Sequence, residues 1–244
     1  MRMTQSLNPI LFAAITVGTT GFAFSTAAQA GASASVGVAN LYLFRGQNLS
    51  NSAPQVYGSL DYEHESGPYA GIWGSSEGAA GGQEYDVYVG FKGEVNDFFF
   101  DVNFTAYEYP SNTKADKTNG QNSANDFGDF SEFILKFGTM GFSFTLVDSL
   151  QGENSSDPDS KDAGYNYYAL SYDTDVYGVT VGYHDLPGTP DDTNMTHLDL
   201  NYYATDELTF TLSQVVDQDP DKRDEAAFND DLLFVVNWSK SFDL

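Results

Sequence analysis

The chain has 244 residues, no cysteine, and 35 acidic residues against ten basic ones. Such an acidic chain repels phosphate backbones, which argues against nucleic-acid binding. Without cysteine, neither a disulfide framework nor a thiol metal site can form. Aromatic residues make up 15% of the chain and fall in short runs with Val, Leu and Gly, a composition that favours β-strands over helices.

Residues 1–30 have the three-part pattern of a secretory signal, with a basic start, an apolar stretch over Ile10–Phe24 and the small-residue site Ala28-Gln29-Ala30. An N-terminal membrane anchor is the alternative, but Thr and Gly interrupt the apolar stretch. We therefore expect cleavage before Gly31 and a mature domain of residues 31–244. That domain keeps all 35 acidic residues and nine basic ones, a net charge of −26.

After the signal, no apolar segment approaches the roughly 18 residues that a membrane-spanning helix needs, so strands must make any crossing. Apolar and polar residues alternate with period 2 in many short segments, which predicts strands with one apolar and one polar face. Twelve such segments are found, at Ala34–Arg45, Gln55–Glu63, Tyr69–Trp73, Tyr85–Lys92, Phe98–Thr105, Glu132–Phe137, Phe142–Leu146, Tyr168–Tyr172, Tyr177–His184, His197–Tyr202, Leu208–Leu212 and Leu232–Trp238.

The connections between these segments alternate between short and long. Short turns are expected at His64–Pro68, Glu94–Asp97, Gly138–Gly141, Asp173–Val176 and Ala204–Glu207. Long polar loops are expected at Gly46–Pro54, Ser75–Gln83, Pro110–Asp126, Asp148–Gly164, Asp185–Met195 and Val216–Asp230.

This alternation predicts an all-β, antiparallel, up-and-down transmembrane barrel, with short turns toward the periplasm and long loops outside the cell. The even strand count places both termini in the periplasm. A soluble β-sandwich or a lipocalin-like barrel is the competing fold, because its strands also alternate. Ten or fourteen strands also remain open.

Several segments are similar to a known family. The opening Val36–Gly46, together with Asp61–Gly67 and Tyr69–Ser75, resembles the TorF family, whose members are regarded as porins. Shorter similarities lie at Glu84–Asp86, Asn125–Gly128 and Ser241–Leu244. The resemblance implies an outer-membrane barrel and supplies no substrate. Independently, the end of the chain carries apolar residues in one register, like the C-terminal assembly signal of outer-membrane proteins.

The expected function is an outer-membrane porin or narrow solute channel, not an enzyme, with no cofactor. Its partners would be outer-membrane lipid and lipopolysaccharide, the barrel assembly machinery and small solutes, and a homo-oligomer is left open. The candidate pore-lining residues are Arg45, Tyr57, Asp61, Asp86, Tyr88, Lys92, Asp101, Glu132, Lys136, His184, His197 and Asp199. Acids outnumber bases among the residues expected to face inward, which predicts a weak preference for cationic or neutral solutes.

Tyrosines on the same predicted face would narrow the lumen further, namely Tyr57, Tyr88, Tyr107, Tyr167 and Tyr203.

Three other functions stay open from the residues. A barrel enzyme such as a lipid hydrolase would use His184 or His197, which flank one loop, as general base, but no motif marks a nucleophilic serine. The acidic runs Asp217–Glu225 and Asp157–Asp162 invite calcium, yet they lack the glycine and terminal glutamate of a calcium-binding loop. A structural surface barrel would need aromatic anchors in its loops, which are mostly Asp, Asn, Ser and Gly.

Overall fold

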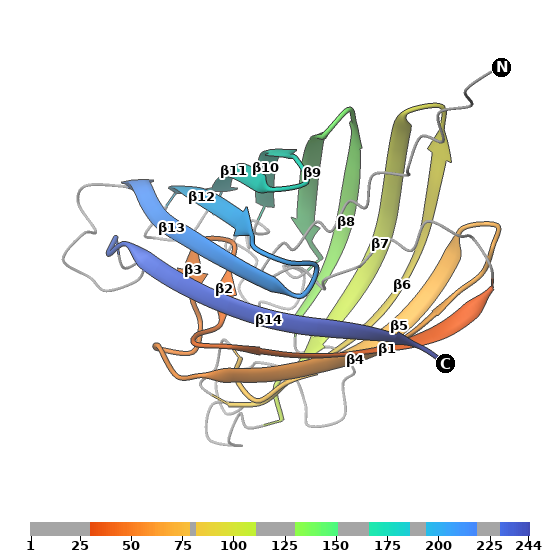
Figure 1. Ribbon diagram of the computed structural model, residues 1–244, viewed down its shortest axis with the longest axis horizontal. Helices are drawn as coiled ribbons and strands as arrows, with labels where there is room; N and C mark the ends of the chain where they lie inside the picture. The colour runs from red at the N-terminus through yellow and green to blue at the C-terminus, as the bar shows by residue number, and fades with distance from the viewer. Residues whose placement is uncertain (1–29, 79–81, 111–129, 151–165, 186–193, 219–229) are drawn as a thin grey trace, which may run out of the picture.

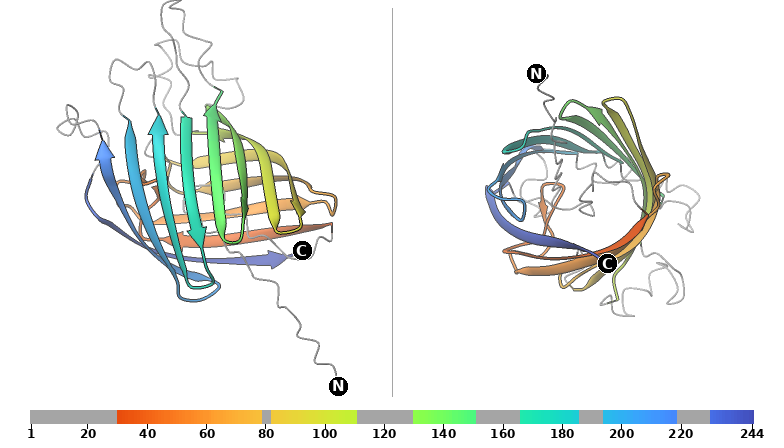
Figure 2. Two further views of the ribbon diagram at one scale, coloured as in Figure 1. Left: turned by 90° about the horizontal axis from the view of Figure 1, so that it is seen from above. Right: turned by 45° about the vertical axis from the view of Figure 1, so that its right-hand side comes forward.

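The computed structural model describes residues 30–78, 82–110, 130–150, 166–185, 194–218 and 230–244. Twelve strands form the wall: β1 Gly31–Ala39, β4 Gln55–Glu63, β5 Pro68–Ser75, β6 Glu84–Val95, β7 Phe98–Glu108, β8 Phe130–Thr139, β9 Phe142–Ser149, β10 Asn166–Asp173, β11 Tyr177–Asp185, β12 Met195–Tyr203, β13 Leu208–Gln218 and β14 Leu233–Asp243. Each pairs antiparallel with its neighbours in the chain, and β1 pairs with β14 to close the barrel (Figures 1 and 2). The predicted twelve-stranded closed barrel is confirmed. Within the described part of the chain, no helix is long and apolar enough to cross a membrane.

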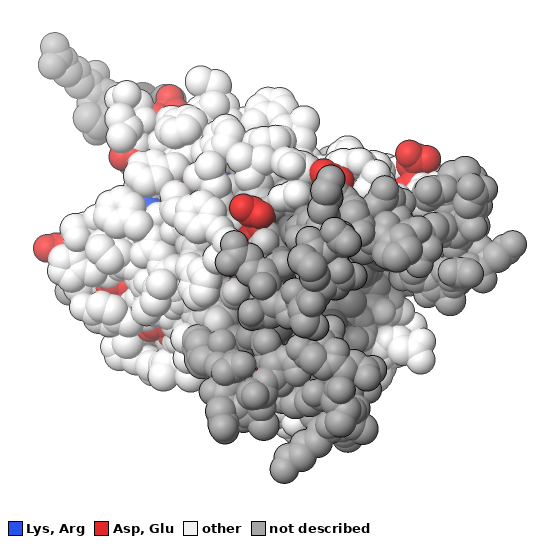
Figure 3. Space-filling view, turned by 180° about the vertical axis from the view of Figure 1, so that it is seen from behind, with Lys and Arg blue, Asp and Glu red and all other residues white. Residues whose placement is uncertain are grey.

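The wall has an apolar outer face and a mostly polar inner face. In β11, Val179 and Val181 are 40% and 46% exposed, whereas Thr180 and His184 on the opposite face are 7% and 0% exposed. The face of this barrel seen in Figure 3 accordingly shows few charged side chains among its described residues. A soluble barrel turns its apolar face inward, so this arrangement is that of a membrane barrel.

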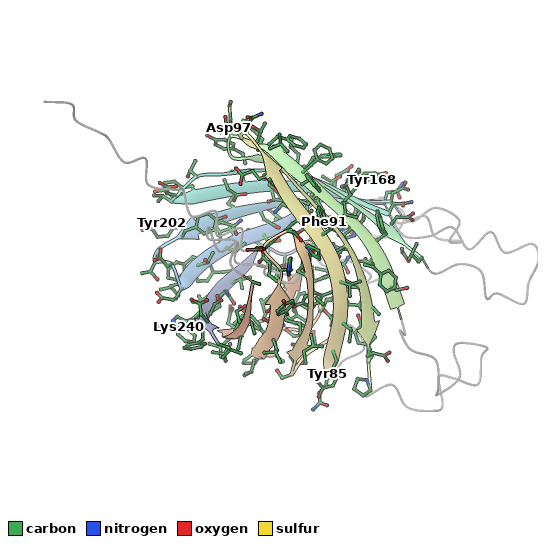
Figure 4. All side chains as sticks on the ribbon, turned by 90° about the vertical axis from the view of Figure 1, so that its right-hand side faces the viewer. Tyr85, Phe91, Asp97, Tyr168, Tyr202 and Lys240 are labelled. Atoms are coloured by element: carbon green, nitrogen blue, oxygen red, sulfur yellow. The ribbon has the colours of Figure 1, made fainter. Side chains whose placement is uncertain are left out.

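Short turns gather at one end of the barrel. They connect β4 to β5, β6 to β7, β8 to β9, β10 to β11 and β12 to β13, as the sequence predicts. The first wall residue, Gly31, pairs with Glu63 beside one of these turns, and the Leu244 amide donates to the carbonyl of Ala32, so both ends of the barrel domain lie there. Figure 4 shows Asp97 in a short turn and Tyr85 at the opposite end of the wall.

Most predicted long loops fall largely outside the described residues. The signal segment except for Ala30 also lies outside them, as do both acidic runs considered for calcium except for Asp217 and Gln218. The connection between β1 and β4 is described in full, and there the sequence-based prediction is wrong.

The first strand ends at Ala39 and not at Arg45. At Asn40 the side-chain amide donates to the Phe234 carbonyl at 2.9 Å, and its oxygen accepts from the Val236 amide at 2.7 Å. Residues 40–54, called here the inward segment, then turn into the barrel, as the right-hand view of Figure 2 shows. They contain a small hairpin of β2 Leu43–Phe44 and β3 Gln47–Asn48.

Tyr42 and Phe44 fall in the predicted strand Ala34–Arg45, where the alternation would place them on its apolar face, but they lie inside the barrel. Gly46–Pro54 is likewise not a solvated external loop. The physical reason is the apolar run after Asn40. Leu41 and Leu43 are 5% and 1% exposed because they pack with Ala39 and with the inner-face residues Leu233 and Val235 of β14. Burying this cluster favours the folded-in position.

Candidate functional site

The inward segment turns back at Arg45, which sits at the tip of its hairpin. Arg45 and Gly46 have φ angles of 49° and 80°, as a two-residue type I′ turn requires. Such a turn favours Asn or Gly, and the left-handed conformation costs other residues about 1–2 kcal/mol. The side chain of Arg45 offsets this cost through a paired contact. Its Nη1 and Nη2 donate to Oε1 and Oε2 of Glu132, each at 2.7 Å, with both side chains almost fully buried.

Groups from three strands hold this ion pair in place. The Tyr107 hydroxyl donates to Glu132 Oε2 at 2.8 Å, and His184 Nε2 donates to the Arg45 carbonyl at 2.7 Å. The Arg45 guanidinium also lies over the ring of Tyr167, 4.9 Å from its centroid. Because charge, hydrogen bonds and ring contact all act on one side chain, Arg45 is fixed relative to the wall.

The structure brings His184 and His197 together, with ring centroids 5.8 Å apart. His197 Nε2 lies 3.0 Å from the Tyr167 hydroxyl, and its Nδ1 lies 3.1 Å from Asp199 Oδ1. The two rings thus support the tip of the inward segment. Among the described residues, no group of three acidic or histidine side chains is placed to hold a metal ion.

The inward segment is also tied to the opposite part of the wall. The Tyr42 hydroxyl donates to Glu84 Oε1 at 3.2 Å, and its ring lies 5.9 Å from that of Trp73. Burial, followed by the nearby Glu84 charge, raises the pKa of Tyr42 well above its ordinary value, so it remains a neutral donor.

The partners of the inward segment lie on β5, β6, β8, β10, β11 and β14, so the segment reaches across the lumen. Glu84, Glu132 and His184 all lie within three residues of the strand ends that face the long connections. The constriction is therefore near that mouth.

Between the inward segment and the short turns, the inner face carries alternating charges. Lys92 and Lys136 lie directly across from Asp101 on the two neighbouring strands. Lys92 Nζ also pairs with Glu63 Oε2 at 2.6 Å, and the Tyr69 hydroxyl donates to Asp101 Oδ1 at 2.6 Å. Positive and negative groups thus share one band of the wall.

Several inner-face acids accept from a tyrosine. The Tyr203 hydroxyl donates to Asp173 Oδ1 at 2.6 Å, and the Tyr88 hydroxyl donates to Asp61. A tyrosine donor satisfies one carboxylate oxygen and leaves the negative charge in place. The inner face therefore stays acidic even though its carboxylates are hydrogen-bonded.

Inner-face tyrosines lie flat against glycines of the adjacent strand. A Cβ built on Gly71 would be 2.5 Å from the Tyr88 ring, and the rings of Tyr57 and Tyr69 cover Gly37 and Gly90 in the same way. The missing side chain makes room for the ring on the wall. These tyrosines therefore take up less of the lumen than their size suggests.

All twelve candidate pore-lining residues lie on the inner side, eleven of them on the wall and Arg45 on the inward segment. They divide into two groups. Near the inward segment are Arg45, Tyr57, Asp86, Glu132, His184, His197 and Asp199, and further toward the short turns are Asp61, Tyr88, Lys92, Asp101 and Lys136.

The sequence did not identify Tyr42, Trp73 and Glu84 as members of the group near the inward segment. It also did not identify Leu233 and Val235, against which that segment packs. A signal for the last two was present, because the final strand is apolar on both faces over Leu232–Val236. An apolar patch on an otherwise polar inner face favours a segment that covers it.

The closed barrel, its apolar outer face and its polar interior define a porin-like membrane β-barrel. The chain belongs to the family described as "Bacterial protein of unknown function (Gcw_chp)", which matches residues 24–242. A search of curated proteins gives no match.

Solved structures share the fold at low sequence identity. A structure described as "Unveiling the Mechanism Behind the in-meso Crystallization of Membrane Proteins" matches with a TM-score of 0.52 and 11% identity, over 88% of this chain and 84% of that chain. A KdgM porin matches with a TM-score of 0.45 and 8% identity, over 87% and 99%. The COG4313 outer membrane channel from Pseudomonas putida F1 matches with a TM-score of 0.41 and 12% identity, over 89% and 97%. At these identities the similarity is one of fold.

Proposed function

We propose that the chain is an outer-membrane channel for small solutes, exported by the signal of residues 1–30 and narrowed by its own inward segment. The observation that carries this proposal is a polar lumen inside an apolar wall, crossed near one mouth by a short anchored hairpin. A twelve-stranded barrel is wider than an eight-stranded one, whose interior side chains can fill. The wall alone would leave a wide lumen, and the inward segment narrows it. The resemblance to the TorF family supports the same function.

The charges of the inner face favour cations. Glu63 and Glu132 are offset by Lys92 and Arg45, whereas several other carboxylates, such as Asp61, accept only from hydroxyl groups. Low-dielectric walls focus the field of such groups. Salt at 0.15 M screens charges beyond about 8 Å, so the preference should be modest and should fall as ionic strength rises.

Bilayer conductance of the purified, refolded mature chain tests both parts of the proposal. The reversal potential in a potassium chloride gradient should show a weak cation preference. Asp101→Asn should lower that preference, whereas Asp175→Asn, in an exposed short turn, should leave it unchanged. Anion preference would contradict the charge argument, and the absence of any conductance would contradict the channel.

A further inference from the structure

Three carboxylates meet beside the inward segment, and one of them is poorly compensated. The acidic neighbours of Asp86 are Glu84 and Glu132. Glu132 is paired with Arg45, and Glu84 accepts from Tyr42. Asp86 is 3% exposed, its carboxyl group is hydrogen-bonded to that of Glu84, and its Oδ1 meets no hydrogen-bond donor within the described part of the chain. Two buried carboxyl groups in contact, one of them with an oxygen that no donor reaches, are stabilised by a cation placed between them, so a cationic ligand would be favoured there.

Aromatic rings adjoin the same carboxylates. Trp73 lies directly across from Asp86 on β5. Its ring centroid is 5.9 Å from that of Tyr42 and 5.9 Å from that of Tyr57. Carboxylates next to aromatic faces are the groups that hold organic ammonium ions, because the ring faces attract cations while tolerating their apolar parts. Metal ions instead require several oxygen or nitrogen ligands in fixed geometry.

We propose that Asp86 and Glu84, together with Trp73, form a binding site for the ammonium group of an organic cation. The proposal rests on the channel function, since the ligand would reach the site through the mouth of the barrel. The Tyr42 hydroxyl is hydrogen-bonded to Glu84 in this structure, so the bound amine takes its place beside Glu84. Binding therefore loosens the inward segment and links the solute to the opening of the constriction.

The test uses 1,4-diaminobutane as the probe and 1,4-butanediol, which has the same length and no charge, as its control. The chain has two tryptophans, and Trp238→Phe leaves Trp73 as the only one. Titration of this refolded barrel with the diamine should give a saturable change in Trp73 emission, and the diol should give none. Asp86→Asn should weaken diamine binding at least tenfold.

Asp173→Asn is the matched control, because Asp173 is an inner-face acid at the other end of the barrel with a tyrosine donor of its own. It should leave diamine affinity unchanged. If Asp86→Asn does not fold, Glu84→Gln replaces it. Equal responses to diamine and diol, or full affinity in the folded variant, would overturn the site and indicate carboxyl groups that share a proton.

The outcome separates this proposal from the channel function. Diamine binding in a barrel that conducts no ions would keep the ammonium site and remove the channel. Conductance in a barrel without saturable diamine binding would keep the channel and remove the ammonium site.

Discussion

Replacing Arg45 by Ala should release the inward segment without unfolding the barrel. The change removes both hydrogen bonds to Glu132, which is 0% exposed and would keep only the Tyr107 hydroxyl. Breaking a buried ion pair by deleting one partner costs about 3–5 kcal/mol. The backbone hydrogen bonds of the wall are untouched, so this cost falls on the position of the inward segment.

At about 1.4 kcal/mol per factor of ten, the fraction of molecules whose inward segment is released should rise by roughly two to four powers of ten. Two measurements report on this fraction. Single-channel conductance of Arg45→Ala should exceed that of the unmodified chain, and Trp73 emission in the Trp238→Phe background should shift as Tyr42 leaves its ring. The double variant Arg45→Met with Glu132→Leu buries no unpaired charge and should return most of the closed population.

Equal conductance and emission in Arg45→Ala and the unmodified chain would show that the ion pair does not hold the inward segment. A double variant more open than the single one would show that packing, and not the ion pair, holds it.

Three further predictions concern the wall. Gly71→Val would place side-chain atoms where the Tyr88 ring lies, so the ring should move into the lumen and lower the conductance. The free energy of unfolding in urea should fall by about 1–3 kcal/mol. Unchanged conductance would contradict the position of the ring flat against Gly71. Val181→Arg, on the outer face in mid-strand, should destabilise the barrel in lipid by about 2–4 kcal/mol, whereas Asp97→Arg in a short turn should have little effect. Because the chain has no cysteine, a membrane-impermeant maleimide on intact cells should label Asp230→Cys and not Asp97→Cys, and the reverse pattern would invert the topology.

Local pattern was enough to predict the wall. The side-chain period of a strand is 2, so each segment such as Gln55–Glu63, which the structure reproduces residue for residue, states its own two faces. Turn and loop lengths are equally local, and together with strand count they define an up-and-down barrel. The inner position of Asp61, Asp101 and Asp199 follows from the same period.

The inward segment could not be predicted in this way. Tyr42 and Phe44 continue the alternation of β1 closely enough to look like wall residues, and nothing near them in the chain shows where they pack. Their position depends on residues brought close only by barrel closure. Asn40 bonds the backbone of Phe234, 194 residues away, and Arg45 pairs with Glu132, 87 residues away.

The sequence by itself therefore determined which residues make the wall and which way they face, because alternation and turn chemistry act over a few residues. Only the tertiary structure decided that residues 40–54 cross the lumen. The apolar inner residues of β14, the Glu132 carboxylate and the histidine pair come together around these residues only when the barrel is closed.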